Sequence, residues 1–245
     1  GRYLKKEVKV LFDENLHGEI VAKNSDGTML IKISDDSLIE KLGTIPLPPY
    51  INNHEQKNTD RYQTVYATDT LLSAAAPTAG LHFSEDILTS LTQKGIKKIE
   101  LSLQIGLGTF QPIRVNNINE HNMHSEQWII SDDTANSINS AKNSNKRILS
   151  VGTTVTRTLE SAYLTRNDKN SSNLNAGSNW TDLFIKPGFK FNVIDMLLTN
   201  FHLPKSTLLV LLSSFASKDL IMTAYQEAIK EKYRFYSFGD AMLII

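Results

Sequence analysis

The chain has 245 residues, of which 40% are hydrophobic and 21% are charged, and its formal net charge is zero. This composition is typical of a globular protein with a packed core. The neutral charge balance argues against a broad basic face for bulk nucleic-acid binding. It leaves open recognition of a small folded RNA feature, in which stacking and shape matter more.

Cysteine is absent, which excludes disulfides, zinc–thiolate sites, iron–sulfur clusters and cysteine nucleophiles. No signal peptide opens the chain, and the longest apolar run, Leu208–Ala216, is far shorter than the roughly 20 residues of a membrane span. We therefore expect a soluble, cytoplasmic protein. The chain opens at Gly1 without an initiator methionine, and we expect further sequence before this residue.

The N-terminal segment predicts short strands. Residues 8–12, 17–23 and 28–33 alternate apolar and polar side chains, and a turn-forming sequence separates the last two. We expect part of a small β-barrel-like domain over residues 1–55. The prolines in 45–51 exclude a helix there, and the polar residues that follow read as a linker.

Residues 56–245 alternate predicted strands and helices, which predicts an α/β catalytic domain with a mixed, largely parallel sheet. Ser84 and Ser131 have the character of helix N-caps. The polar segment 164–180 lacks periodicity and predicts a mobile loop that could act as a lid. Helices are predicted at 84–95, 131–144, 153–164 and 218–233, and strands at 99–107, 147–152, 192–201, 206–215 and 241–245.

Four segments share one design, a strand that ends in small or polar residues: Ala76–Ser84, Gly106–Ile113, Val151–Ser161 and Thr199–Thr207. Ligands of open α/β sheets bind beyond the carboxyl ends of the strands. We therefore expect these segments to meet at one pocket.

The third of these segments predicts an anion site. Gly152, Thr153 and Thr154 would offer backbone N–H groups, hydroxyls and the positive end of a helix dipole to a carboxylate or phosphate. Arg157 could add a charged fork from the next turn. The alternative is a threonine N-cap followed by an exposed arginine, and the sequence leaves both open.

Histidines provide candidates for acid–base chemistry. His124 and Glu126 would lie on one side of an extended segment, where the carboxylate could orient the ring as a proton shuttle. A polar turn is the alternative, and a metal site with His121 lacks further ligands. His82 and His202 lie among apolar residues at predicted element ends, as either catalytic or structural histidines.

Read in order, these motifs resemble the S-adenosylmethionine:tRNA ribosyltransferase-isomerase family of queuosine biosynthesis. The resemblance extends over residues 46–245, with the polar loop as its main gap. The matching blocks are PLPPYI, RYQTVYA, AAPTAGLHF, GLGTFQPI, MHSE, VGTTVTRTLES, WTDLFIKPGFKF, LLTNFHLPKSTLLVLLSSFA and YRFYSFGDAMLI.

The resemblance implies transfer and isomerisation of the ribosyl part of S-adenosylmethionine onto 7-aminomethyl-7-deazaguanine at the wobble position of a tRNA anticodon. The product is epoxyqueuosine, with adenine and methionine released. It implies no metal or cofactor, because the sulfonium of this substrate already acidifies the adjacent ribose C5′ protons. It also implies an α/β domain with an inserted β-barrel-like domain, and we expect a monomer that binds no membrane.

The resemblance also implies site residues. The expected acid–base residues are His82, His124, Glu126 and His202. Gly106 and Gly108 would let backbone approach the adenosyl group or the deazaguanine. The expected substrate-binding residues are Arg61, Thr78, Gly106, Gly108, Thr109, Phe110, Gly152, Thr153, Thr154, Arg157 and Asn200.

Rival interpretations come from other classes. One is a nucleotide-ribose hydrolase or transferase that uses the same strand-end pocket. Another is a non-catalytic RNA-binding module, which strong salt-dependent binding to any RNA would indicate. A third is a scaffold that binds neither substrate.

Overall fold

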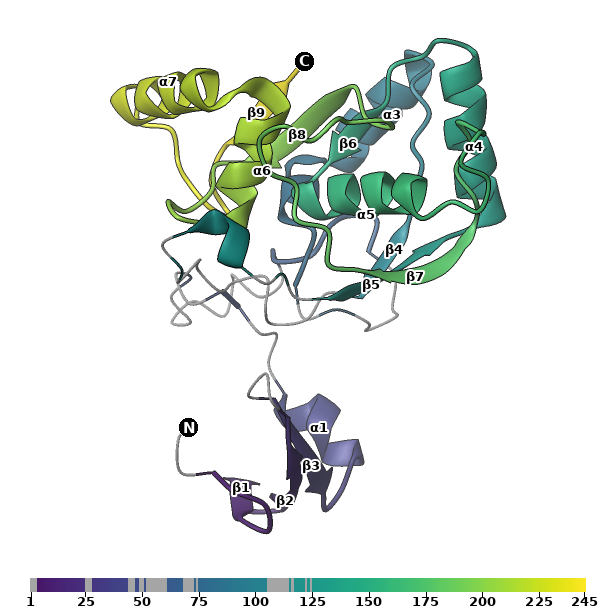
Figure 1. The fold of residues 1–245 in the computed structure, drawn as a ribbon. Helices are drawn as coiled ribbons and strands as arrows, with labels where there is room; N and C mark the ends of the chain where they lie inside the picture. The colour runs from purple at the N-terminus through teal and green to yellow at the C-terminus, as the bar shows by residue number, and fades with distance from the viewer. Residues whose placement is uncertain are drawn as a thin grey trace. The chain divides into compact units, whose positions relative to one another are not determined.

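The chain divides into two compact units, Gly1–Pro46 and Leu47–Ile245 (Figure 1). The boundary that we expected between residues 55 and 56 lies outside the described residues, so the division 1–55 and 56–245 stays a prediction. The computed structural model describes residues 4–24, 28–43, 47–48, 51, 61–67, 73, 75–104, 115, 117–121, 123 and 125–245, without the Glu40 side chain.

The smaller unit holds a three-stranded antiparallel sheet in the order β1-β2-β3. All three strands were predicted, because alternation along β2 buries Leu16 and Ile20 on one face. A short helix, which alternation could not reveal, follows the sheet. A barrel-like closure of this unit stays a prediction. The elements are β1 Lys9–Asp13, β2 Leu16–Lys23, β3 Met29–Ile33 and α1 Ser37–Leu42.

The larger unit mixes helices with short strands. Its 3-10 helices are η1 Thr78–His82 and η3 Ile118–Glu120, and its strands are β4 Ser102–Gln104, β5 Glu126–Ile130, β6 Leu149–Val151, β7 Gly177–Thr181, β8 Met196–Asn200 and β9 Ala241–Ile244. Its α-helices are α3 Glu85–Gln93, α4 Asp132–Asn143, α5 Thr153–Leu164, α6 Thr207–Ala216 and α7 Lys218–Lys230. The predicted helices α3, α4, α5 and α7 are confirmed, with serine caps at Ser84 and Ser131 as expected.

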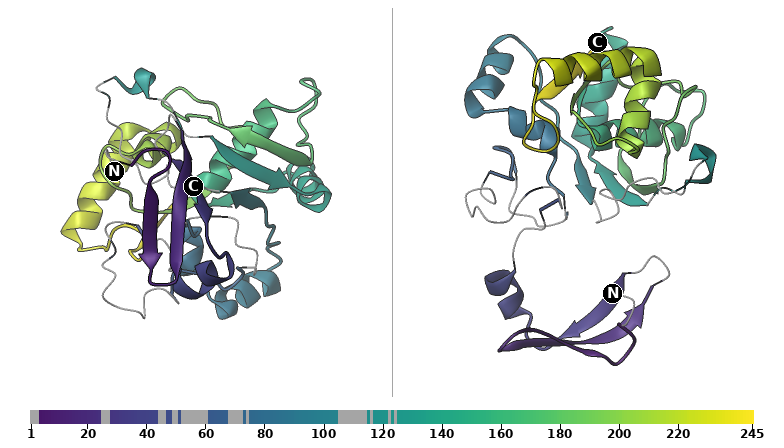
Figure 2. Two further views of the ribbon diagram at one scale, coloured as in Figure 1. Left: turned by 90° about the horizontal axis from the view of Figure 1, so that it is seen from below. Right: turned by 90° about the vertical axis from the view of Figure 1, so that its left-hand side faces the viewer.

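The strands of this unit form two small sheets, in the orders β4-β5-β7 and β6-β8-β9. The mixed α/β character is confirmed, but the expected largely parallel sheet is not. Among the described strands, only β6 and β8 pair in parallel, and every other pairing is antiparallel. Figures 1 and 2 show β5 and β7 side by side at the edge of the unit.

The predicted strand 206–215 is wrong, because this segment is helix α6. Its apolar run fits a buried strand and a buried helix equally well, so periodicity alone could not decide. Ser206 begins the helix, since its hydroxyl accepts a hydrogen bond from the Leu209 N–H at 3.2 Å. Leu211 and Leu212 are then buried in two different core clusters.

The end of the polar segment 164–180 is also not the loop that we expected. Residues 177–181 form β7, which pairs with β5 and places Trp180 opposite Gln127. Asparagine and serine disfavour strands on their own, and the hydrogen bonds to β5 override that preference. Residues 165–176 have no regular structure.

A core that joins both sheets surrounds α5. In Figure 1, α5 runs between β5–β7 and β6–β8. Trp128, Leu159 and Leu197, from β5, α5 and β8, are buried in one cluster. A second cluster packs Leu212 of α6 and Tyr225 of α7 against Phe201. Within the described ranges, no single helix is long and apolar enough to cross a membrane, and α6 and α7 pass that test only as a pair bent by 114°.

Candidate functional site

Three segments meet at the carboxyl ends of the parallel strands β6 and β8. The Gly152 N–H, directly after β6, donates to the Leu198 carbonyl of β8 at 2.8 Å. The Thr78 hydroxyl of η1 donates to the Asn200 side-chain oxygen at the end of β8, at 2.9 Å. A Cβ atom added to Gly152 would lie 3.9 Å from the Ala79 Cβ. The structure thus brings together three of the four predicted segments, although Ala76–Ser84 contains the 3-10 helix η1 and not the end of a strand.

The side chain of Asn200 connects two of these segments. It is 2% exposed, its oxygen accepts from Thr78, and its Nδ2 lies 3.1 Å from the His82 Nε2. Burial lowers the pKa of His82, and this effect outweighs the nearby Asp240, which raises the pKa, while Arg234 lowers it further. The ring is therefore neutral near pH 7.

The turn from β6 to α5 depends on glycine. Gly152 has a φ of 96°, a conformation that residues with a Cβ rarely adopt. No side chain caps α5, and the Thr156 hydroxyl lies 2.9 Å from Ser150 Oγ and 3.2 Å from the Gly152 carbonyl oxygen, so it can donate a hydrogen bond to one of them at a time. Thr153 is buried and Thr154 is half-buried. An anion site formed by Gly152, Thr153 and Thr154 stays a prediction.

Arg157 is buried, which contradicts the alternative of an exposed arginine. Its Nη1 lies 2.8 Å from Glu126 Oε2, and its Nε donates to the Leu183 carbonyl at 3.1 Å. Nη2 is buried and finds no hydrogen-bond partner in the described part of the chain. Burial lowers the pKa of Arg157, which the charge of Glu126 partly offsets. The ion pair of Arg157 and Glu126 links α5 to β5. A role for Arg157 in anion binding stays a prediction.

His202 lies directly after β8, where its Nε2 is 2.8 Å from the Thr199 hydroxyl and its backbone N–H donates to the Tyr225 hydroxyl at 2.8 Å. Burial of the ring lowers the pKa of His202 to about 4. The ring is therefore neutral near pH 7. These contacts are those of a structural histidine, and an acid–base role for His202 stays a prediction.

The segment before η1 contributes Tyr66, which the sequence analysis did not name as a site residue. Tyr66 packs so closely on η1 that a Cβ atom added to Gly80 would lie 2.0 Å from its hydroxyl. Burial raises the pKa of Tyr66, and the charge of Glu100 raises it further. Arg61, expected to bind substrate, lies with its guanidinium 5.8 Å from the centre of the Phe238 ring. The resemblance block RYQTVYA contained Tyr66, but no chemical signal distinguished it.

Several predicted site residues lie outside the described residues: Gly106, Gly108, Thr109, Phe110 and His124. The proposed pairing of His124 with Glu126 therefore stays a prediction. Across the ranges that the structure describes, no group of three or more histidine, aspartate or glutamate side chains could hold a metal ion.

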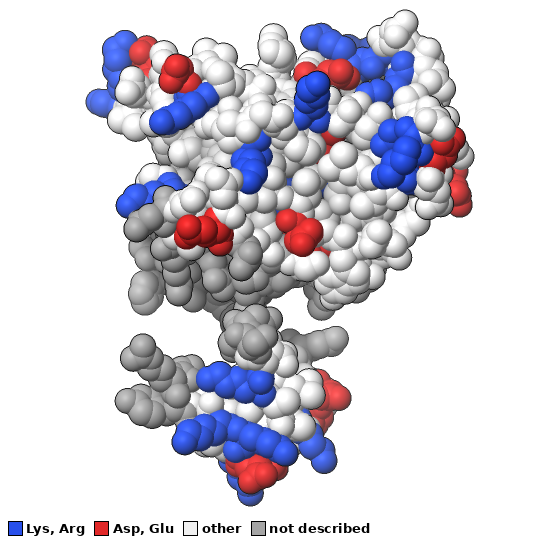
Figure 3. All heavy atoms as spheres, viewed as in Figure 1, with Lys and Arg blue, Asp and Glu red and all other residues white. Residues whose placement is uncertain are grey.

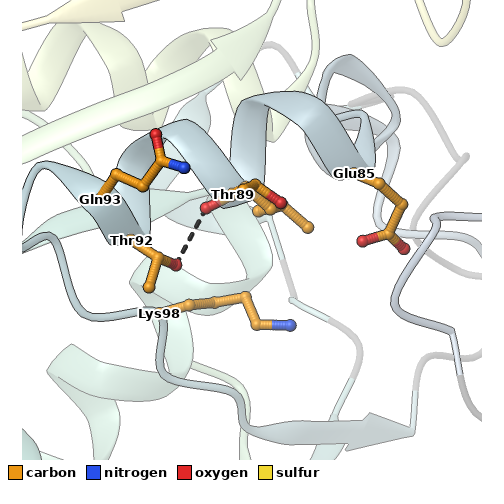
Figure 4. Close-up of a pocket in the computed structure, with 6 residues that line it drawn as sticks. Glu85, Thr89, Thr92, Gln93 and Lys98 are labelled. Atoms are coloured by element: carbon orange, nitrogen blue, oxygen red, sulfur yellow. Dashed lines mark hydrogen bonds between the residues drawn. The ribbon is translucent and has the colours of Figure 1, made fainter.

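A hollow of about 330 Å³ lies on the surface of α3, away from the strand ends in sequence (Figure 4). Its lining comes from one helix and Lys98, and the Thr92 hydroxyl there donates to the Leu88 carbonyl at 3.0 Å. None of the predicted site residues lines it. We therefore place the candidate site at the strand ends, where polar side chains from separate segments converge.

Comparison with known proteins identifies the family. The family described as "Queuosine biosynthesis protein" matches residues 1–244. The chain is 49% identical to S-adenosylmethionine:tRNA ribosyltransferase-isomerase of Halothermothrix orenii, over 100% of this chain and 71% of the relative. It is 48% identical to the protein of the same name from Natranaerobius thermophilus, over 94% of this chain and 66% of the relative.

A solved structure agrees with these relatives. The S-adenosylmethionine tRNA ribosyltransferase of Thermotoga maritima matches 100% of this chain and 68% of its own chain, with 32% identity and a TM-score of 0.55. The chain thus spans about two thirds of the length of the proteins that it matches. It belongs to the queuosine biosynthesis protein family, whose curated relatives are S-adenosylmethionine:tRNA ribosyltransferase-isomerases.

Proposed function

We propose that this chain transfers and isomerises the ribosyl part of S-adenosylmethionine onto 7-aminomethyl-7-deazaguanine in tRNA, giving epoxyqueuosine and releasing adenine and methionine. The observation that carries the proposal is the 49% identity over the whole chain to a protein of that name. The meeting of η1, β6 and β8 supports it, because ligands of α/β folds bind beyond the carboxyl ends of parallel strands.

The reaction needs groups that this site could supply. A base must remove a proton from the ribose carbon beside the sulfonium, and adenine leaves more easily when a donor hydrogen-bonds to it. We assign His82 to the neighbourhood of the ribose and adenine, because its ring lies at the junction of η1 and β8. We assign the base to the predicted pair of His124 and Glu126.

The methionine part of the substrate carries a carboxylate, which we assign to the N-terminus of α5. Gly152 and Thr153 begin this helix without a side-chain cap, so its first N–H groups face no capping oxygen. The positive end of the helix dipole favours an anion at this position. S-adenosylmethionine brings the reactive sulfonium itself, so we propose that the reaction uses no further cofactor.

The other substrate is a tRNA with the modified guanine at the wobble position. On the face shown in Figure 3, basic and acidic side chains are interspersed over the larger unit, in keeping with the net charge of zero. We therefore expect recognition of the anticodon by shape and base stacking rather than by bulk charge. We place the reaction in the cytoplasm and propose that the protein acts as a monomer, which light scattering would test.

Adenine release tests the proposal. The purified chain is incubated with S-adenosylmethionine labelled in the ribose, with tRNA that carries 7-aminomethyl-7-deazaguanine or with the same tRNA carrying guanine. We expect adenine release and transfer of label to RNA only with the modified tRNA. Release of adenine without transfer of label would instead identify a hydrolase, and a folded chain that releases no adenine with either tRNA would refute the proposed activity.

A further inference from the structure

Both polar atoms of the buried Asn200 amide form hydrogen bonds, each with a different side chain of η1. Its Oδ1 lies 2.9 Å from the Thr78 hydroxyl, and its Nδ2 lies 3.1 Å from the His82 Nε2. With 2% of the residue exposed, water cannot replace either partner. The three side chains therefore form one connected chain of hydrogen bonds between β8 and the two ends of η1.

The direction of these bonds determines where the proton on His82 lies. In the orientation that the structure gives this amide, Oδ1 accepts a hydrogen bond from the Thr78 hydroxyl. Its nitrogen then donates, so the His82 Nε2 accepts from the Asn200 Nδ2. A neutral imidazole that accepts at Nε2 carries its proton on Nδ1.

We propose that Asn200 is a positioning residue that holds His82 as the neutral tautomer with its proton on Nδ1, so that this N–H serves as a hydrogen-bond donor to the substrate. The inference rests on the proposed function for the identity of that substrate. The acceptor would be a ring nitrogen of adenine or a ribose oxygen of S-adenosylmethionine. His82 then cannot be the base through Nε2, because that lone pair is already occupied.

The charged groups around the ring agree with a neutral His82. Asp240 and Arg234, from the segment before β9, both influence His82, and they neutralise each other in an ion pair of 2.9 Å. Burial is the largest effect and lowers the pKa of His82. Beyond Asn200, the structure shows no hydrogen bond to this ring in the described ranges, so Nδ1 is available to a ligand.

A neutral imidazole is suited to this task. It polarises an acceptor through its N–H without giving up the proton, as the neutral histidine of triosephosphate isomerase does. The hydrogen bond strengthens as negative charge develops on the leaving group, which is when it contributes to the rate. His82 neither gains nor loses a proton in this step.

Nitrogen NMR of the imidazole rings tests the tautomer directly. The chain contains 6 histidines, so ¹⁵N-histidine labelling gives few signals, and a His82→Gln variant assigns the ring in question. At pH 7 we expect a protonated Nδ1 and an unprotonated Nε2. A ring with its proton on Nε2, or a charged ring, would overturn the inference.

Two substitutions test the role of Asn200. Asn200→Asp places a carboxylate against Nε2, which should move the proton to Nε2, raise the pKa of His82 and slow adenine release at least tenfold. Thr78→Val should release the amide and mix the two tautomers, whereas Thr78→Ser should keep the wild-type signals. Asn170→Asp, in an exposed loop, is the matched control for added charge and should change none of these readouts.

The two readouts separate the inference from the proposed function. The NMR signals require no turnover, so they decide the tautomer even if wild-type protein releases no adenine. If Asn200→Asp moves the proton to Nε2 and leaves both the rate and the pH profile of adenine release unchanged, the positioning role is wrong. If the rate falls but the ring signals stay as in wild type, Asn200 acts by another route and the inference also fails.

Discussion

The carboxylate of Glu160 on α5 offers a quantitative test of how the larger unit is held together. Glu160 is 0% exposed, and it accepts hydrogen bonds from three consecutive backbone N–H groups before β8. Oε2 accepts from Asn192 at 2.8 Å, and Oε1 accepts from Val193 at 2.9 Å and from Ile194 at 3.2 Å. A glutamine at this position keeps one acceptor oxygen. Its NH₂ group replaces the other oxygen, so a donor then faces a backbone N–H donor.

The expected loss of stability follows from the number of these hydrogen bonds that the glutamine can keep. If the glutamine oxygen keeps Val193 and Ile194, the Asn192 N–H loses its acceptor in a half-buried position. An unsatisfied buried donor costs about 1–3 kcal/mol, so we expect Glu160→Gln to lower the free energy of unfolding by about 2 kcal/mol. In a chain of this length, that corresponds to a fall in Tm of about 4–8 °C.

Tryptophan fluorescence during urea or thermal unfolding measures the change in the relevant unit. Both tryptophans of the chain, Trp128 in β5 and Trp180 in β7, belong to the larger unit. Glu227→Gln is the matched control, since Glu227 is exposed and pairs with Lys230 on the surface of α7, at 2.9 Å. We expect it to cost less than about 1 kcal/mol. Equal stability of the two variants would refute the reasoning.

Three further predictions follow from the packing around the site. Arg157→Met should lower the free energy of unfolding by about 3–5 kcal/mol, because Glu126 then loses its buried ionic partner; urea unfolding of this variant and of the double variant with Glu126→Gln measures the coupling. Gly80→Ala should cost about 1–3 kcal/mol, because its Cβ would collide with the Tyr66 hydroxyl, and Tyr66→Phe should recover part of that loss. Burial lowers the pKa of His202 in the folded state to about 4, against about 6.5 unfolded, so stability should fall as pH drops through that window, and a pH series with His202→Gln should lose this part of the dependence.

For each of these three predictions, one experimental outcome would contradict the reasoning. A double variant of the buried pair no more stable than Arg157→Met alone would show that the charge that Glu126 retains is not the main cost. A Gly80→Ala protein as stable as wild type would mean that Tyr66 moves aside freely. An unchanged pH dependence in His202→Gln would show that the ring already titrates as it does in the unfolded chain.

The local elements could largely be predicted from sequence. Alternation identified β1, β2 and β3, and capping serines located the starts of α3 and α4. The Gly152 turn between β6 and α5 was also visible, because a glycine separates the predicted strand from the predicted helix, and glycine adopts the observed φ of 96° readily. These features depend on neighbours within a few positions along the chain, so the sequence contains their cause.

The sequence predicted the candidate site only in part. Thr78, His82 and Asn200 were named from strand-end motifs, but their hydrogen-bonded connection joins positions far apart in the chain. The burial of Arg157 against Glu126 was not foreseen, because a helix start gives no indication of what packs against its second turn.

By itself, the sequence determined the family, the helix starts, the strands that alternate, and the polar residues at strand ends. Only the tertiary structure decided that 206–215 is helix rather than strand, that β7 joins β5, and that His82 and Asn200 share one hydrogen bond. The reason is physical: caps and alternation are local, whereas an apolar run or a polar loop takes the conformation that its distant partners stabilise.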